Sequence, residues 1–489
     1  MSEFYTNTDH FVLLPAIMLA LFGCAVLLFD FFVFPEARQR KWLIVFLVLG
    51  LGFSGYALWR QQAYLEESGL KQIQAFHGAL VADGSSLFFN WIFLVASLIV
   101  ALISYRYLEV ENEHHGEYYG LILLANCGMF FLASGADLVT LFVGLELMAI
   151  CFYVMVGFLR HDKRSNEAAM KYFLLGAFSS GFLAYGFSVL YGLAGSTILS
   201  DVAGALGARE PWDPAVIIAL VTTTVGLLFK ISAVPFHMWA PDAYEGAPTT
   251  VTAYLAVGSK AASFALLLRI FLGPFSLLRE VWEPALAAVA IATLTLGNFA
   301  AVSQSNIKRL LAYSSISHAG YMLLGLIAGN DTGIKGVSIY ILMYTFMTLG
   351  AFLVLVALRR RDVLGEDLDD ISGLMHKSPG YALLMLVFLL SLAGIPPTAG
   401  FIAKYYIFLS LIETQRNLLA VFAALYVAVA IYYYFRVVRS MFAGPAAAQP
   451  PLASSLGVRV ALAVTGILTL VMGIYPEPFV QMAQISLLR

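Results

Sequence analysis

The sequence predicts an all-α membrane protein that crosses the bilayer about fourteen times. Two features of the composition favour this fold class: 61 % of the 489 residues are hydrophobic, and only 12 % are charged. A soluble protein needs more polar cover for its core, and ordinary domains carry roughly 25 % charged residues. The third observation is that the apolar residues fall in runs long enough to cross a hydrocarbon core of about 30 Å as helices.

The predicted spans are helices because an open strand edge in lipid would leave backbone groups unpaired. The alternating pattern of a membrane β-barrel does not occur in the sequence. In chain order, the fourteen spans are expected at residues 11–34, 42–58, 87–105, 117–135, 137–159, 168–194, 215–243, 248–272, 284–303, 310–328, 333–358, 381–411, 417–439 and 460–480.

The positive residues predict how the spans are oriented. Sixteen lysines and arginines lie in or beside the loops that follow odd-numbered spans, eight lie on the opposite side, and four fall inside spans. Cytoplasmic loops carry the excess of positive charge, so both termini are expected to face outward. The net charge of −2 provides no basic field for nucleic acid.

Five charged residues are expected inside spans: Glu146, Lys171, Lys230, Lys260 and Lys404. Each costs about 2.5–3.5 kcal/mol at a helix centre, or roughly 12–18 kcal/mol together. Positions facing lipid would not retain such a cost, so these side chains are expected to face the protein interior or internal water and to serve function. The alternative for Lys171, which lies near a span end, is that its long side chain reaches the interface.

Prolines interrupt two unusually long spans. Pro235 follows Lys230 in the seventh span, and Pro396 and Pro397 precede Lys404 in the twelfth. Proline removes a backbone donor and clashes with the preceding turn, so both helices are expected to split. Interrupted spans in corresponding positions of two halves are typical of the ion pathway in transporters built from repeats. Harmless proline kinks are the alternative.

Two histidines are candidate proton relays. His318 shares one helix face with Ser314 and Tyr321, and His237 lies just beyond the first break. Imidazole titrates near physiological pH, which suits a relay, whereas a neutral, hydrogen-bonded core histidine is the alternative for both.

No cofactor site is expected in this chain. Cys24, Cys127 and Cys151 stand singly in apolar runs, without the spacing of an iron–sulfur or zinc site, and no phosphate-binding loop motif occurs. A row of coupled charges has no energy source of its own. The sequence therefore predicts a partner that performs exergonic chemistry.

Four segments resemble the antiporter-like subunits of respiratory complex I: LFVGLELMAI, LLFKISAVPFHMWAPDAYEGAPTTVTAYLAVGSKAA, NIKRLLAYSSISHAGYMLLG and AGIPPTAGFIAKYYIF. The resemblance covers most of residues 117–440. It implies fourteen helices with two inverted five-helix repeats, whose broken helices are the seventh and twelfth. The implied organisation is three N-terminal helices in 1–116, repeats in 117–272 and 284–440, and a last helix in 460–489.

The resemblance also implies roles for the five charged residues. The family's key carboxylate falls on Glu146 and its key lysine on Lys230, with Lys171 as the sixth-span lysine near the carboxylate. Lys260 matches the connecting lysine of the eighth span, and Lys404 matches the outlet residue of the twelfth. M-type members carry glutamate where Lys404 stands, and L-type members lack the eighth-span lysine, so the resemblance is to N-type members, the counterparts of mitochondrial subunit 2.

An N-type member implies proton translocation in the bacterial inner membrane, with both termini in the periplasm. Its expected neighbours are K-type and M-type subunits and the lateral helix of the L-type subunit. NADH, FMN, iron–sulfur clusters and quinone would bind partner subunits. The alternatives are a subunit of a multisubunit sodium/proton antiporter or of a membrane-bound hydrogenase. A solute symporter is less favoured because no substrate-binding motif is evident.

Overall fold

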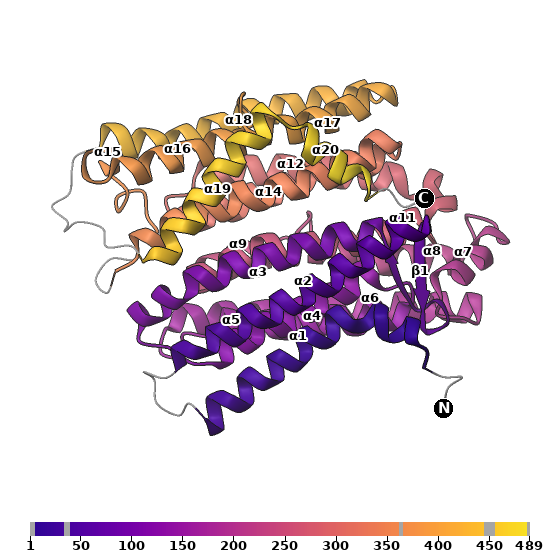
Figure 1. The fold of residues 1–489 in the computed structure, drawn as a ribbon. Coiled ribbons are helices and arrows are strands. Elements are labelled where there is room, and N and C mark those ends of the chain that lie inside the picture. The colour runs from indigo at the N-terminus through magenta and orange to yellow at the C-terminus, as the bar shows by residue number, and fades with distance from the viewer. Residues whose placement is uncertain (1–4, 34–39, 361–364, 445–454, 487–489) are drawn as a thin grey trace.

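The computed structural model describes residues 5–33, 40–360, 365–444 and 455–486. These residues form one bundle of long helices (Figure 1). Twelve of the described helices are long and apolar enough to cross a membrane. The predicted all-α, multi-pass membrane fold is therefore confirmed, while the count of fourteen spans and the inverted repeats stay predictions.

A short hairpin that the sequence does not predict lies between the second and third long helices in chain order. The strands pair in antiparallel fashion, with Gln72 opposite Asp83. Asp83 then caps the helix that follows, since its carboxylate accepts from the backbone N–H of Ser86. The elements are α1 (Asn7–Phe32), η1 (Arg40–Trp42), α2 (Leu43–Ser68), β1 (Gln72–Ala75), η2 (Phe76–Gly78), β2 (Leu80–Asp83) and α3 (Gly84–Glu111).

Two spans are interrupted where the prolines stand. The first ends at Lys230, and the chain becomes helical again at Trp239, so residues 231–238 are non-helical. In the second span, the first helix ends just before Gly394, which has a left-handed φ of 86°. Residues 394–398 separate the two helical halves of this span. A left-handed residue just after a helix is the usual glycine stop signal. The four pieces are α8 (Pro214–Lys230), α9 (Trp239–Gly246), α16 (Pro379–Ala393) and α17 (Ala399–Glu413).

The eighth predicted span is irregular as well, which the sequence did not reveal. A turn of π-helix, η3 (Leu255–Ser259), stands between α10 (Thr249–Tyr254) and α11 (Lys260–Leu272). Such single-turn π insertions are frequent at functional sites. This one rotates the helix directly before Lys260.

The centre of the bundle is formed by α13 and α14, whose side chains are almost all buried. The outer helices α1, α2, α18 and α19 carry exposed apolar side chains instead, as helices facing lipid or other subunits do. The remaining elements are α4 (Glu117–Ser134), α5 (Leu138–Val156), α6 (Lys163–Ala194), α7 (Leu199–Gly207), η4 (Ser276–Leu278), α12 (Arg279–Val302), α13 (Ile307–Ala328), α14 (Asp331–Leu358), α15 (Leu374–Lys377), α18 (Asn417–Ala443), α19 (Leu456–Ile474) and α20 (Glu477–Gln484).

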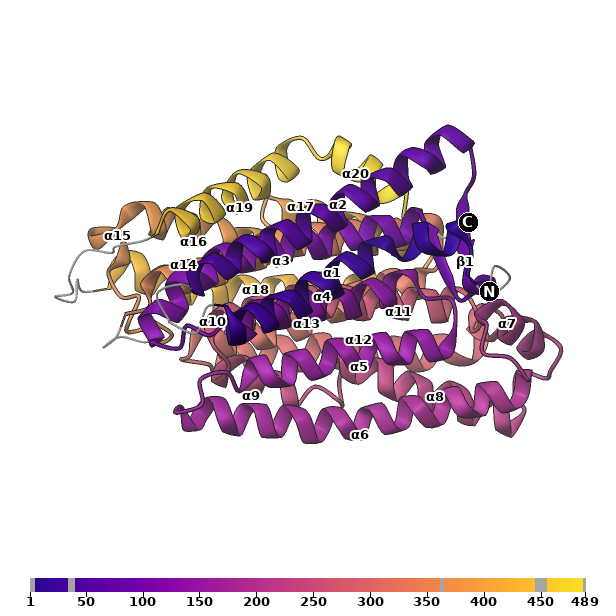
Figure 2. The same ribbon diagram turned by 60° about the horizontal axis from the view of Figure 1, so that its bottom comes forward.

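The start of α1 and the helix α20 lie at the end of the bundle that carries β1, and α15 lies at the opposite end (Figures 1 and 2). Arg38, Arg361 and Arg489, which contributed to the predicted orientation, lie outside the described residues.

Candidate functional site

Glu146 and Lys230 are joined through a serine that lies between them. The Ser180 hydroxyl on α6 donates to Glu146 Oε1 on α5, and Lys230 Nζ donates to Ser180 Oγ at 3.4 Å. Lys230 is 6 % exposed and is the last residue of α8. The free carbonyls at a helix C-terminus favour a cation, so the break at Pro235 creates a local environment suited to a buried lysine.

Lys260 is held by a different serine on α13. Its Nζ donates to the Ser315 carbonyl at 2.6 Å and also contacts Ser315 Oγ. The Tyr344 hydroxyl donates to the same Oγ at 2.8 Å, and the Tyr344 ring lies 5.9 Å from Lys260 Nζ. Lys260 is therefore buried among polar groups of α13 and α14.

Lys404 fills the second break. Its Nζ donates to the carbonyls of Leu392 at 3.2 Å and Ala393 at 2.8 Å, which are the last residues of α16. The Tyr321 ring lies 5.0 Å from the same nitrogen. A Cβ at Gly394 would approach Lys404 Cδ to 2.8 Å, so the close packing of this lysine requires glycine there. Each break therefore has a buried lysine beside it, and at the second break that lysine donates to helix C-terminal carbonyls.

His318 lies in the buried region between Lys260 and Lys404. Its Nδ1 is 2.6 Å from the Tyr340 hydroxyl, and its Nε2 is 3.4 Å from the Tyr434 hydroxyl. Ser314, one turn earlier, contacts the same Tyr434 hydroxyl. His318 and Ser314 therefore share one polar surface, as their spacing suggests, and that surface is completed by Tyr340 and Tyr434, which the sequence did not single out.

Comparisons with known proteins show the family of this chain. Residues 135–455 match the family described as NADH:quinone oxidoreductase/Mrp antiporter. The chain is 68 % identical to NADH-quinone oxidoreductase subunit N 2 of Solibacter usitatus, covering 100 % of this chain and 99 % of the relative. It is 51 % identical to subunit N 1 of Koribacter versatilis, covering 99 % and 96 %. The chain belongs to the NADH-quinone oxidoreductase subunit N family.

Solved structures show the same fold. A chain of respiratory complex I from Thermus thermophilus matches with a TM-score of 0.80 and 33 % identity, covering 96 % of this chain and 99 % of that one. A chain of the Mrp complex from a Dietzia species matches with a TM-score of 0.84 and 20 % identity, covering 98 % and 97 %, which is a likeness of fold alone. The resemblance to antiporter-like subunits of complex I is confirmed, and identity favours the subunit N family over the sodium/proton antiporter alternative.

The position of Lys171 differs from the expectation for this subunit N homologue. Its side chain is 47 % exposed and pairs with Glu167 at 2.8 Å and Asp242 at 3.0 Å, not with Glu146. The reason is that α6 begins at Lys163, so Lys171 lies near the end of the bundle where acidic side chains are within reach. The structure therefore corrects the placement of Lys171 within the buried row, and the interface alternative describes it better.

His237 also lies apart from the buried lysines. It is half-buried in the non-helical segment 231–238, and its Nδ1 has no hydrogen-bond partner among the described residues. No group of three or more His, Cys, Asp or Glu side chains within the described part of the chain is arranged to hold a metal ion.

Sequence reasoning missed Ser180 and Ser315, which make the direct contacts to Lys230 and Lys260. The available signal was weak: both are serines inside apolar spans, where a hydroxyl frequently bonds across to another helix. Many other serines in this chain share that property, so the sequence could not single them out.

Proposed function

We propose that this chain carries protons across the membrane through Glu146, Lys230, Lys260 and Lys404, as the proton-translocating membrane-arm subunit of an NADH–quinone oxidoreductase. Membership of the subunit N family supports the second part of the proposal. The observation that supports the first part is the set of three buried lysines, two of them beside helix breaks, with Ser180 placed between Lys230 and the partly buried Glu146.

The chemistry follows from the shared hydroxyl. When Glu146 is ionised, Ser180 donates to it and accepts from Lys230, so the charges of the carboxylate and the ammonium stabilise each other. A proton that neutralises Glu146 removes this stabilisation and favours release of a proton from Lys230. His318 and its tyrosines lie between Lys260 and Lys404 and give a polar connection toward the second break.

Energy for this transport comes from partner subunits in the proposed assembly. NADH, FMN, iron–sulfur clusters and quinone bind there, and this chain contributes no cofactor. The exposed apolar faces of α1, α2, α18 and α19 suit lipid and neighbouring membrane subunits, which we propose to be K-type and M-type subunits with the L-type lateral helix.

We further propose that the chain lies in the bacterial inner membrane with both termini in the periplasm, following the distribution of positive residues. Residues 1–116, 117–272, 284–440 and 460–489 would then be the N-terminal helices, the two inverted repeats and the last helix. The two breaks, each with a buried lysine beside it, support corresponding positions in two repeats.

Exchanging Glu146 for glutamine tests whether the carboxylate titrates. Glu146→Gln keeps the volume and an acceptor for Ser180 but cannot take up a proton. We expect proton pumping at least about 100-fold slower through this subunit, the lower range for loss of a general acid or base, with the complex still assembled. Pumping is measured in inverted membrane vesicles and assembly on native gels.

The matched control is Glu117→Gln, because Glu117 is a partly exposed residue on α4 whose carboxylate pairs with Arg160. We expect parental pumping from it. A fully active Glu146→Gln variant would show that Glu146 acts in packing or hydrogen bonding alone, and the proton path would lose its first member.

Removing the bridging hydroxyl should have a smaller effect. A hydrogen bond to a charged group contributes about 1.5–3 kcal/mol, so Ser180→Ala is expected to lower pumping roughly ten-fold. The adjacent Ser179, whose hydroxyl donates to the Gly226 carbonyl, supplies the control variant Ser179→Ala. Equal pumping by the two variants would contradict the bridging role of Ser180.

A further inference from the structure

A cluster of charged side chains surrounds α9, the short second half of the broken seventh span. Arg309 on α13 reaches both acidic residues of α9: its Nη1 lies 2.8 Å from Asp242 Oδ1 and 2.9 Å from Glu245 Oε2. Glu245 is also bonded by Arg164 on α6 at 3.2 Å, and Asp242 by Lys171. The two acids are three residues apart and so share one face of α9, which is held from two neighbouring helices.

Lys308, which precedes Arg309 on α13, forms a hydrogen bond at the end of α9. Lys308 Nζ donates to the carbonyl of Ala247, the residue directly after α9, at 2.7 Å. The same nitrogen pairs with Glu366 at 2.9 Å, and the side chains of Lys308 and Glu366 are only 2 % and 7 % exposed. Removing one partner of such a buried pair leaves an uncompensated charge.

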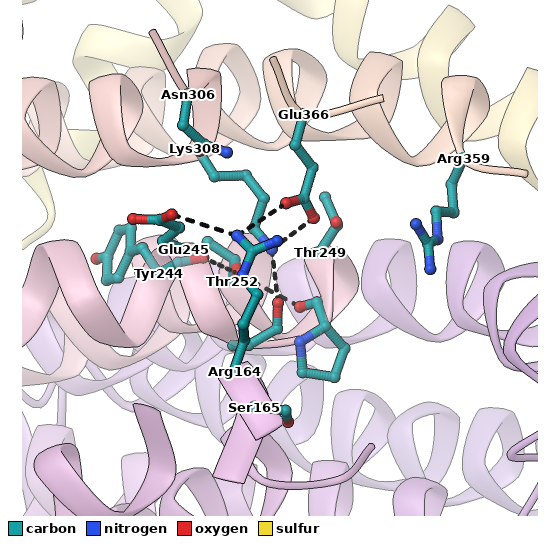
Figure 3. Close-up of polar contacts among 12 residues, drawn as sticks. Arg164, Ser165, Tyr244, Glu245, Thr249, Thr252, Asn306, Lys308, Arg359 and Glu366 are labelled. Atoms are coloured by element: carbon teal, nitrogen blue, oxygen red, sulfur yellow. Dashed lines mark hydrogen bonds and ion pairs between the residues drawn. The ribbon is translucent and has the colours of Figure 1, made fainter. Parts of the chain in front are cut away.

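Glu366 is itself fixed between the two halves of the chain. Its carbonyl accepts from the backbone N–H of Ile307 at 2.7 Å, which joins the loop after α14 to the start of α13. Its carboxylate lies 3.6 Å from Arg164 of α6, as the central dashed lines of Figure 3 indicate. In the same loop, burial raises the pKa of the neighbouring Asp367 carboxyl. The loop thus connects α6 of the first half with α13 of the second.

The other end of α9 is connected to Lys230. The Trp239 indole N–H, at the first residue of α9, donates to the carbonyl of Phe229 at 3.0 Å. The indole is stacked on Phe229 on one side and on Tyr172 of α6 on the other, with centroid separations of 5.5 and 4.5 Å. Because Phe229 directly precedes Lys230, a displacement of α9 would move the lysine relative to Ser180.

We propose that Arg164, Lys308, Arg309 and Glu366 form a clamp on α9 that positions Lys230 against Ser180 and Glu146. The clamp residues are positioning residues, and they join the second half of the chain to the charged pair of the first. This inference rests on the proposed role of Lys230 in the proton path. None of the clamp residues needs to give up a proton, and this separates a clamp from an extension of the path.

The clamp is tested in the assembled complex with variants of two clamp residues. Arg309→Gln removes both bonds to α9 at a half-exposed site, where loss of an ion pair changes stability little. Lys308→Met removes the hydrogen bond to the Ala247 carbonyl. We expect both to lower pumping roughly ten-fold or more, because a misplacement of about 1 Å can cost up to 100-fold in a reaction that depends on geometry. Lys308→Arg should retain pumping, since arginine can donate to both the carbonyl and the carboxylate.

Two further variants make the result decisive. Arg416→Gln is the matched control for Arg309→Gln: Arg416 pairs with Glu283 at similar exposure but has no contact with α9, so we expect parental pumping. Lys230→Ala is the reference for the path itself. Reduced pumping by Lys230→Ala with parental pumping by Arg309→Gln overturns the clamp alone, whereas parental pumping by Lys230→Ala overturns the proton path and the clamp with it.

The outcomes for the two Lys308 variants also support or overturn the clamp. If native gels show that the complex with Lys308→Met does not assemble, the clamp is tested by Arg309→Gln alone, because the half-exposed site of Arg309 tolerates the exchange. If Lys308→Arg fails as completely as Lys308→Met in an assembled complex, then Lys308 itself releases a proton, since arginine is effectively always protonated, and the clamp is overturned.

Discussion

A Lys230→Ala variant is expected to assemble into the oxidoreductase and to lose most proton pumping and quinone reductase activity together. Lys230 is buried at the end of α8, and its ammonium group donates to Ser180, whose hydroxyl donates to Glu146. Alanine leaves Glu146 without its counter-charge and removes a proton-carrying group. Loss of such a group slows proton transfer by about 100- to 10,000-fold. Because redox chemistry and transport are coupled in the complex, electron transfer should slow as well.

The measurement is proton uptake by inverted membrane vesicles, normalised to NADH oxidation and to the amount of complex on native gels. Lys335→Ala is the matched control, because Lys335 is a lysine near the start of α14 whose ammonium lies over the Tyr406 ring rather than in the buried series. Normal pumping per electron at normal turnover in Lys230→Ala would refute the assignment of Lys230.

The sequence predicted the helix breaks well because their causes are local. Proline lacks a backbone donor wherever it stands, so Pro235 and Pro396 mark interruptions without knowledge of any neighbour. The lysines were equally visible, since a charge in an apolar run is costly in every environment that lipid can offer. These features required no information on how the helices pack.

The partners of those lysines could not be predicted in the same way. The central helices α13 and α14 are buried on nearly every side, so their hydrophobic pattern does not show which face meets which neighbour. Ser180, Ser315 and Tyr344 acquire their roles only through the rotation of one helix against another. The π-turn before Lys260 changes that rotation, and nothing in LAVGS distinguishes it from ordinary α-helix.

The prediction that Lys171 is buried was wrong, because its side chain is 47 % exposed. The composition of its span suggested burial, whereas its side chain reaches Glu167 one turn earlier and Asp242 on α9. The acidic partner one turn away was visible in the sequence as an i,i+4 pair. The start of α6 at Lys163, which places this pair near the end of the bundle, decided the outcome and was misjudged by five residues.

Lys404→Arg is expected to impair pumping even though it conserves the positive charge. Lysine at this position satisfies the last carbonyls of α16, those of Leu392 and Ala393, and arginine can donate to the same carbonyls. The structural contacts are therefore retained, while the ability to release a proton is lost because arginine is effectively always protonated. We expect transport through the outlet to fall by at least about 100-fold, the lower range for loss of a proton-transferring group.

Lys404→Glu separates charge from proton exchange at the same site. The resemblance implies glutamate at this position in M-type members, and a protonated glutamate can donate to one of the α16 carbonyls before it releases its proton. We expect this variant to pump better than Lys404→Arg despite the reversed charge, in inverted vesicles and with assembly verified on native gels. The order of the two variants is what distinguishes the roles: an outlet needs a group that exchanges protons, whereas a fixed cation that only neutralises the end of α16 would make arginine the better replacement. Parental pumping by Lys404→Arg would therefore place the outlet elsewhere and leave Lys404 as a helix cap.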